Sequence, residues 1–173
     1  MGDFMNKLSR RLRHLQSGTG VGEKLFPPDV IESITAAIVE GELTHRGEVR
    51  LIVEAALPGE AIWAGLTIRE RAIALFAEHG IWDTEDNCGV LLYVNLADHK
   101  VEIVADRNIN RKVTHPQWQA ICDTMTQGFR RGEYGPATLL AIAEVNALLR
   151  QHFPADASRG VDVNELPDHP VMI

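Results

Sequence analysis

The apolar run at residues 90–94 limits the possible folds more than any other segment of the chain. It reads Val-Leu-Leu-Tyr-Val, and Leu96 follows after a single polar residue. A strand that is apolar on both of its sides is typical of the middle of a sheet that helices cover on both faces. The run therefore predicts a layered α/β domain.

The segments around this run predict the order of the elements. Residues 48–54 alternate between polar and apolar side chains, which indicates a half-buried strand. Thr67 and Glu70 have the spacing of a capping box at the start of a helix that ends at Gly80. A strand–helix–strand unit makes its two strands parallel, with a right-handed crossover. Residues 101–106 then return as the second strand of a hairpin.

Apolar residues at helical spacing predict further helices near residues 28–41, 116–131 and 139–152. Together the elements predict a three-layer α/β/α sandwich with a small mixed β-sheet.

The length of 173 residues favours one domain, which we place at residues 27–154. Residues 1–26 are predicted to be a basic N-terminal helix at 4–15 followed by a flexible linker at 17–22, and residues 155–173 a polar tail. The chain has no run of eighteen apolar residues and no apolar core of a signal peptide. We therefore expect a cytoplasmic protein without a transmembrane segment, whose basic arm at 4–15 offers a weak possibility of peripheral membrane contact.

Charge and residue spacing exclude several classes of function. A formal net charge of -7 argues against a protein built to bind nucleic acid. The two cysteines form no metal-binding or redox pair, and the seven histidines show no spacing for zinc on a helix. We expect these histidines at the surface, and we expect Trp63, Trp82 and Trp118 to pack at or near the core.

Acidic and amide side chains cluster just before the apolar run. If the hairpin turn centres on residues 97–98, paired residues have numbers that sum to about 195, and Asp106 lies opposite Gly89. The parallel strand brings Glu48 to the same edge. The predicted site therefore comprises Glu48, Asp83, Glu85, Asp86, Asn87 and Asp106.

Clustered carboxylates repel one another unless a cation lies among them, and calcium accepts six to eight oxygen ligands with tolerant geometry. Magnesium is less favoured without a phosphate ligand. The loop is not an EF-hand, because Cys88 stands where glycine is required and Val94 where the bidentate glutamate belongs. A purely structural alternative remains open, in which Asp83 and Thr84 cap the turn, Asp86 is solvated, and Arg107 or Arg111 neutralises the rest.

The chain resembles the TPM domain family, in particular its cytoplasmic bacterial members that lack a signal peptide or membrane anchor. The resemblance covers about residues 44–170. It is carried by residues 71–77, 81–85, 87, 89–94, 96–98, 101–107, 118–122, 129, 132, 152–154 and 164–168.

The resemblance implies a compact α/β/α domain. It also implies divalent ions on loops at one edge, as in some relatives, and a phosphatase activity, which has been attributed to plant relatives that act in photosystem II repair. Two residues depart from the family pattern: Cys88 replaces an asparagine and Asn108 a glycine.

Three hypotheses follow. The first is a calcium-binding module that acts through an unknown protein partner. The second is a metal-assisted phosphomonoesterase, with Arg107 and Arg111 as the candidates for binding phosphate and no identified nucleophile. The third is a membrane-peripheral factor.

Overall fold

The computed structural model describes residues 9–10, 14, 20–156, 158 and 164–173. In chain order the elements are α2 (Gly20–Leu25), α3 (Pro28–Glu42), β1 (Glu48–Glu54), α4 (Gly59–Trp63), α5 (Ile68–Glu78), β2 (Gly89–Asn95), β3 (Lys100–Ala105), α6 (Arg107–Asn110), α7 (His115–Arg130), α8 (Tyr134–His152) and β4 (Val171–Met172).

The four strands form one mixed sheet in the order β3-β2-β1-β4. Strand β1 is parallel to β2 and to β4, whereas β2 and β3 form an antiparallel hairpin. Val90 pairs with Ala105, so the predicted hairpin register is confirmed. Strand β4 was not predicted, because a strand of two residues is too short to show a periodic pattern.

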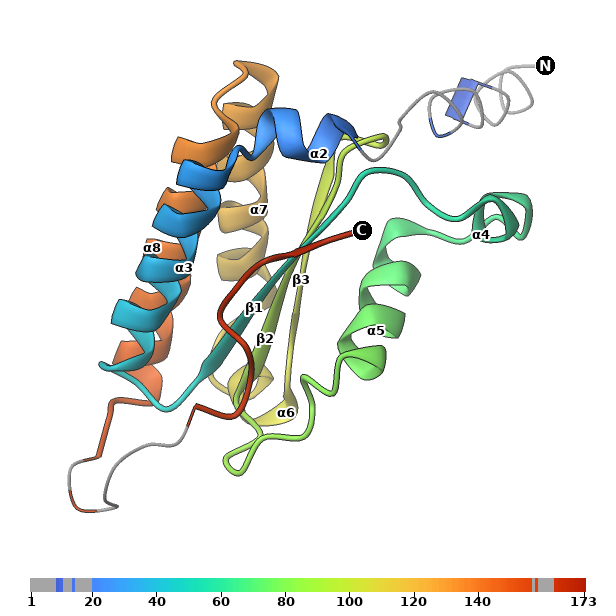
Figure 1. Cartoon of the computed structure of the whole chain (residues 1–173). Helices are drawn as coiled ribbons and strands as arrows, with labels where there is room; N and C mark the ends of the chain where they lie inside the picture. The colour runs from blue at the N-terminus through green and yellow to red at the C-terminus, as the bar shows by residue number, and fades with distance from the viewer. Residues whose placement is uncertain (1–8, 11–13, 15–19, 157, 159–163) are drawn as a thin grey trace.

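Helices cover both faces of the sheet, which confirms the predicted layered α/β fold. Figure 1 shows α3, α7 and α8 on one face and α5 on the other. Strand residues such as Leu51 and Leu92 pack toward the first group of helices, and their neighbours Ile52 and Leu91 pack toward α5. The apolar run at residues 90–94 therefore contributes side chains to the hydrophobic cores on both faces of the sheet.

Strand β1 was predicted to be half-buried, but all seven of its residues are buried. Its polar residues are covered by the C-terminal segment and by α5. Glu48 accepts a hydrogen bond from the backbone N–H of Leu166 (3.2 Å), and Arg50 donates to the carbonyl of His169 (2.9 Å). Arg71 of α5 pairs with Glu54. The prediction was wrong because it took the tail as detached from the sheet.

The N-terminal region also differs from the prediction. Helix α2 begins at Gly20, inside the segment predicted to be a linker, and leads to Phe26. The ring of Phe26 packs in the core, with its centroid 6.3 Å from that of Phe129 and 6.0 Å from that of Tyr134. Anchoring of Phe26 explains why the chain is helical before it. Residues 1–8, 11–13 and 15–19, and with them most of the basic arm, lie outside the described residues. Arg10 is described and pairs with Asp98 at 2.8 Å.

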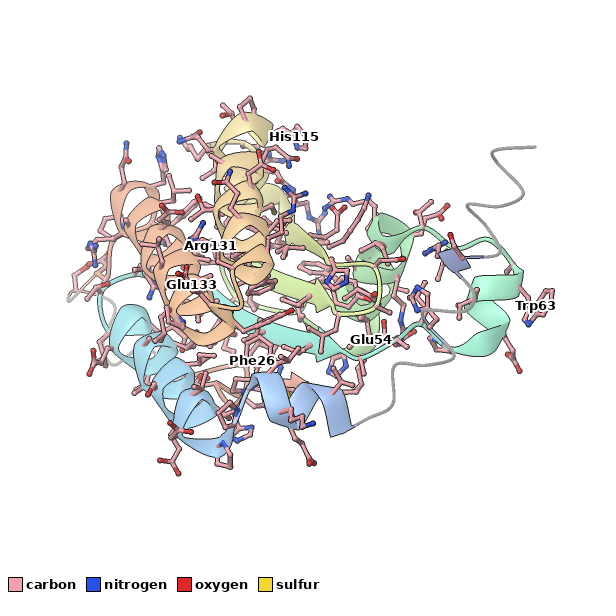
Figure 2. The ribbon with its side chains drawn as sticks, turned by 90° about the horizontal axis from the view of Figure 1, so that it is seen from above. Phe26, Glu54, Trp63, His115, Arg131 and Glu133 are labelled. Carbon is pink, nitrogen blue, oxygen red and sulfur yellow. The ribbon has the colours of Figure 1, made fainter. Side chains whose placement is uncertain are left out.

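Local sequence signals predicted the longer helices correctly but not the shortest ones. The capping box at Thr67 and Glu70 is present. Helices α4 and α6 were missed because they are about one turn long. Of the tryptophans, Trp118 is buried as expected, but Trp63 is 72% and Trp82 52% exposed. Trp63 projects outward from α4 (Figure 2), so the prediction of core packing was wrong for both.

Candidate functional site

The predicted acidic edge forms where β1 and β2 begin and β3 ends. Glu48 pairs in register with Gly89, and the backbone N–H of Asp106 donates to the Gly89 carbonyl (2.9 Å). Glu48, Gly89 and Asp106 therefore stand side by side on three neighbouring strands, at the end of the sheet where α6 lies in Figure 1. The predicted juxtaposition of these three backbone positions is confirmed.

Glu48 is nevertheless separated from Asp106. A Cβ atom on Gly89 would lie 1.9 Å from the carbonyl oxygen of Ile81, so the backbone of Ile81 rests directly on this glycine. That backbone occupies the space between the two carboxylates on the α5 face. Glu48 is instead turned toward the C-terminal segment, where Leu166 binds it.

The turn at residues 83–87 is held by its own polar groups. The Thr84 hydroxyl accepts a hydrogen bond from the N–H of Cys88 (3.0 Å), and the N–H of Asn87 donates to the Thr84 carbonyl (3.0 Å). Asn87 has a positive φ of 51°, a backbone region that asparagine tolerates better than most residues. Asp83 and Glu85 are exposed. Thr84 caps the turn, as the structural alternative predicted, but Asp86, which that alternative took as solvated, is paired with Arg46.

Asp106 lies next to this turn and begins α6. Its Oδ1 accepts a hydrogen bond from the N–H of Arg107 (2.6 Å), whereas its Oδ2 is buried and has no hydrogen-bond partner among the described residues. The residue is only 7% exposed. A buried carboxylate oxygen without a partner is costly, and it marks a place where a water, ion or ligand would lower the free energy.

Hydrogen bonds join the start of α6 to the turn. The side chain of Asn108 donates to the Asp86 carbonyl (2.5 Å), and the guanidinium of Arg107 donates to Oδ1 of Asn87 (3.3 Å). The Asp86 carboxylate pairs with Arg46 at 2.8 Å. The structure thus brings Asp86, Asn87 and Asp106 together through neighbouring groups.

The carboxylates do not form a ready-made metal cage. Within the described ranges, no three His, Cys, Asp or Glu side chains are close enough together to hold a metal ion. Arg107 lies beside Asp106, as the structural alternative allowed, with its side chain 72% exposed, and Arg111 is exposed at the C-terminal end of α6. The Cys88 thiol is buried and donates to the Asp86 carbonyl (3.3 Å).

A second group of acids was missed by the sequence analysis. Glu42, at the end of α3, accepts a hydrogen bond from the N–H of Val49 (2.8 Å) and faces Glu48 and Asp168. Burial, aided by the neighbouring negative charges, raises the pKa of Glu42 to about 9. Nothing in the sequence signals this group, because the C-terminal segment brings Asp168 to the sheet from far along the chain.

The fold and the site can be compared with known proteins. A model of the TPM domain matches residues 21–148, which is most of the chain. The chain belongs to the TPM domain family. Its assignment to a cytoplasmic bacterial subgroup stays a prediction.

Among solved structures, this TPM domain is similar to the BA42 protein from the psychrophilic bacterium Bizionia argentinensis, determined by NMR. The TM-score is 0.71 at 24% identity, over 83% of this chain and 92% of that one. Such a likeness supports the fold alone. No curated protein matches the chain significantly. In the part of the chain that the structure describes, no helix is long and apolar enough to cross a membrane.

Proposed function

We propose that this TPM domain is a non-enzymatic module that binds a divalent cation, with calcium favoured, at Asp106 and the neighbouring turn, and that it acts through a protein partner. The observation that carries the proposal is the unpartnered Oδ2 of the buried Asp106. It lies beside a turn whose amide and carbonyl oxygens are already held in place.

The nature of these oxygens favours calcium. Asp106 supplies one buried carboxylate, so the other ligands would come from the Asn87 amide, backbone carbonyls, exposed acids of the turn such as Asp83, and water. Calcium accepts this mixture and tolerates irregular geometry, whereas magnesium prefers an octahedral shell and usually keeps several waters. In the absence of an ion, Arg107 and Arg46 balance the negative charge of Asp106 and Asp86.

The exposed Trp82 supports a role in protein interaction. It directly precedes the acidic turn and is 52% exposed. Tryptophan is enriched among the residues that dominate binding energy at protein interfaces. A cation that orders the turn would also fix the position of this side chain.

The phosphatase alternative has weaker support. Arg107 and Arg111 could contact a phosphate near Asp106, but Arg107 already donates to Asn87. The nearest thiol, Cys88, is buried and hydrogen-bonded, so it is not placed to attack a substrate. Hydrolysis of p-nitrophenyl phosphate that Asp83→Ala abolishes without unfolding the protein would favour this alternative over ours.

The cation proposal is tested by calcium titration followed by backbone NMR. We expect shifts at residues 83–87 and 106–108, and we expect Asp106→Asn to remove them. The control is Asp123→Asn, which changes an exposed acid on α7 that is hydrogen-bonded to Gln119, and it should leave the shifts intact. Unchanged spectra of the wild type at millimolar calcium would rule the site out.

A further inference from the structure

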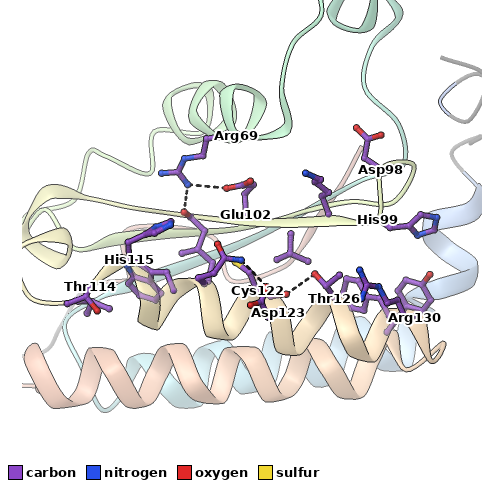
Figure 3. Close-up of a pocket in the computed structure, with 18 of the residues that line it drawn as sticks. Arg69, Asp98, His99, Glu102, Thr114, His115, Cys122, Asp123, Thr126 and Arg130 are labelled. Carbon is purple, nitrogen blue, oxygen red and sulfur yellow. Dashed lines mark hydrogen bonds and ion pairs between the residues drawn. The ribbon is translucent and has the colours of Figure 1, made fainter. Parts of the chain in front are cut away.

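A groove runs along the free edge of the sheet, away from the acidic turn. Its volume is about 950 Å³, and it lies between β3, which is an edge strand, and α7. Figure 3 shows Arg69 of α5 on one side of β3 and residues of α7 on the other. None of the six predicted metal ligands lines this groove.

A buried donor without a partner lies in the groove wall. Trp118 lines the groove and is only 6% exposed, yet its indole Nε1 has no hydrogen-bond partner among the described residues. A buried tryptophan usually donates this N–H to an acceptor, and an unsatisfied buried donor costs about 1–3 kcal/mol. An occupant that reaches this indole would therefore gain a hydrogen bond that no described residue makes.

Unpaired positive charges outnumber negative ones along the groove. Two of its three acids are ion-paired, Asp98 with Arg10 and Glu102 with Arg69, whereas Asp123 accepts a hydrogen bond from the neutral Gln119 and keeps its charge. In the described part of the chain, Lys100 and Arg130 have no ion-pair partner, and both are exposed. This groove therefore favours a negatively charged occupant, although the whole protein carries a net charge of -7.

The shape of the groove fits an extended chain. In Figure 3, Thr114 and His115 lie at one end and His99 and Arg130 at the other. From His115 to Arg130, α7 spans about 22 Å at the usual rise per residue. An extended peptide of six or seven residues covers this length. The volume is at the upper end of the range for small-molecule sites, so a long occupant uses it better than a compact one.

The backbone of β3 presents one open position to such a chain. The register with β2 turns the N–H and C=O groups of Val101, Ile103 and Ala105 away from β2. Arg69 binds the Ile103 carbonyl (2.5 Å) and Asn110 the Ala105 carbonyl (2.5 Å), which blocks pairing there. Among the described residues, no side chain caps Val101.

We propose that the groove between β3 and α7 binds an extended acidic segment of a partner protein. The segment pairs with the backbone of Val101, accepts the hydrogen bond of the Trp118 indole, and places its acids near Lys100 and Arg130. Edge-strand addition of this kind takes affinity from the main chain and specificity from alternate side chains. This inference rests on the proposed role in protein interaction and not on the cation.

The probe is a fluorescein-labelled hexapeptide of alternating glutamate and valine. Fluorescence anisotropy measures its binding, and NMR follows the indole resonance of Trp118, which is assigned with Trp118→Phe. We expect a Kd of about 0.1 mM and a clear shift of that resonance. A hexapeptide of alternating lysine and valine is the control for charge. The acidic peptide with its second valine replaced by proline is the control for main-chain pairing. Both are expected to bind at least tenfold more weakly.

Matched variants locate the site. The double change Lys100→Glu with Arg130→Glu is expected to weaken binding of the acidic peptide at least tenfold. The control double change, Lys24→Glu with Arg150→Glu, alters exposed residues outside the groove by the same total charge and is expected to bind as the wild type does.

Several outcomes would overturn the proposal. These are no shift of the Trp118 indole at millimolar peptide, equal binding of the acidic and basic peptides, or equal weakening by the two double variants. If the proline peptide binds as tightly as the acidic peptide, the segment does not pair with the main chain of Val101. An indole shift that depends on protein concentration alone would mean that a second copy of this chain occupies the groove. The calcium titration reports the turn and α6, so the failure of either proposal is recognisable separately.

Discussion

Two buried carboxylates at opposite ends of the sheet show how similar groups can serve different purposes. Glu54, at the C-terminal end of β1, is 2% exposed, and Asp106, after the end of β3, is 7% exposed. Arg71 binds one oxygen of Glu54 at 2.8 Å and the Tyr93 hydroxyl binds the other. Asp106 has one oxygen capped by a backbone N–H and one without a partner among the described residues.

The two carboxylates differ in whether their hydrogen bonds are complete, and this distinguishes a structural group from a candidate ligand-binding group. The polar side chains next to Glu54 are also hydrogen-bonded: Asn95 donates to the Tyr93 hydroxyl (3.1 Å) and accepts from the N–H of Asp98 (3.0 Å). Burial and the hydrogen bond to Glu54 raise the pKa of Tyr93, so its hydroxyl remains a donor. A complete network of this kind rigidifies the fold and leaves nothing for a ligand. Asp106 keeps an unused acceptor.

The largest effect is expected from breaking the complete network. Arg71→Ala leaves the Glu54 carboxylate buried without its cation, and we expect the free energy of unfolding to fall by about 3–5 kcal/mol in urea denaturation. The matched control is Arg131→Ala, which removes an exposed pair with Glu133 and is expected to leave the stability close to that of the wild type. Equal losses in the two variants would mean that the Glu54 network contributes no more than a surface pair.

A smaller loss is expected at the opposite end. A Cβ added at Gly89 would meet the Ile81 carbonyl at 1.9 Å, so Gly89→Ala must displace backbone. We expect the free energy of unfolding to fall by about 2–3 kcal/mol, measured in the same way. A Cβ at Gly59 would meet nothing within 4 Å, and Gly59→Ala is expected to change stability by less than about 1 kcal/mol. Similar results for both glycines would show that Ile81 does not rest on the sheet.

The comparison also shows what the sequence could reveal. The apolar run at residues 90–94 and the alternation in the hairpin were sufficient to predict the layers and the register that puts Asp106 opposite Gly89. These signals are local and periodic. The contact of Ile81 with Gly89 and the hydrogen bond from Leu166 to Glu48 are neither local nor periodic, so the sequence did not reveal that Glu48 is bound by the C-terminal segment.

The C-terminal segment accounts for most of what was missed. It was predicted to be a polar tail, yet Val171 pairs with Ile52 and the carbonyl of His169 accepts from Arg50. A segment that joins a sheet through its backbone needs few apolar side chains, so its composition resembles that of a loop. The groove beside β3 was missed for a related reason, since it arises from the distance between α7 and an edge strand, which no residue pattern encodes.

The third prediction contrasts isosteric changes at the two carboxylates. Without calcium, Asp106→Asn is expected to change the free energy of unfolding by less than about 1 kcal/mol, because asparagine also caps helices and the change removes a buried charge. Glu54→Gln is expected to lose about 2–4 kcal/mol, because Arg71 then loses its buried counter-ion and keeps the more exposed Glu78 at 3.6 Å. With saturating calcium, the Tm of the wild type should rise and that of Asp106→Asn should not. A Tm rise in both proteins would place the cation elsewhere.

A pH-dependent effect is expected from Glu42, a carboxylate beside the C-terminal segment, whose pKa burial raises from 4.5 to about 9. Between these values the folded protein holds a proton that the unfolded chain has lost. The stabilisation is therefore complete below about pH 4.5 and declines as the pH rises toward 9, by at most about 1.4 kcal/mol per pH unit. Glu42→Gln removes the titrating group and keeps an oxygen for the Val49 N–H, so the variant should lose stability less steeply between about pH 5 and pH 8. Glu40→Gln changes an exposed residue of the same helix and should keep the wild-type slope. Parallel pH profiles for Glu42→Gln and Glu40→Gln would mean that folding does not raise the pKa of Glu42.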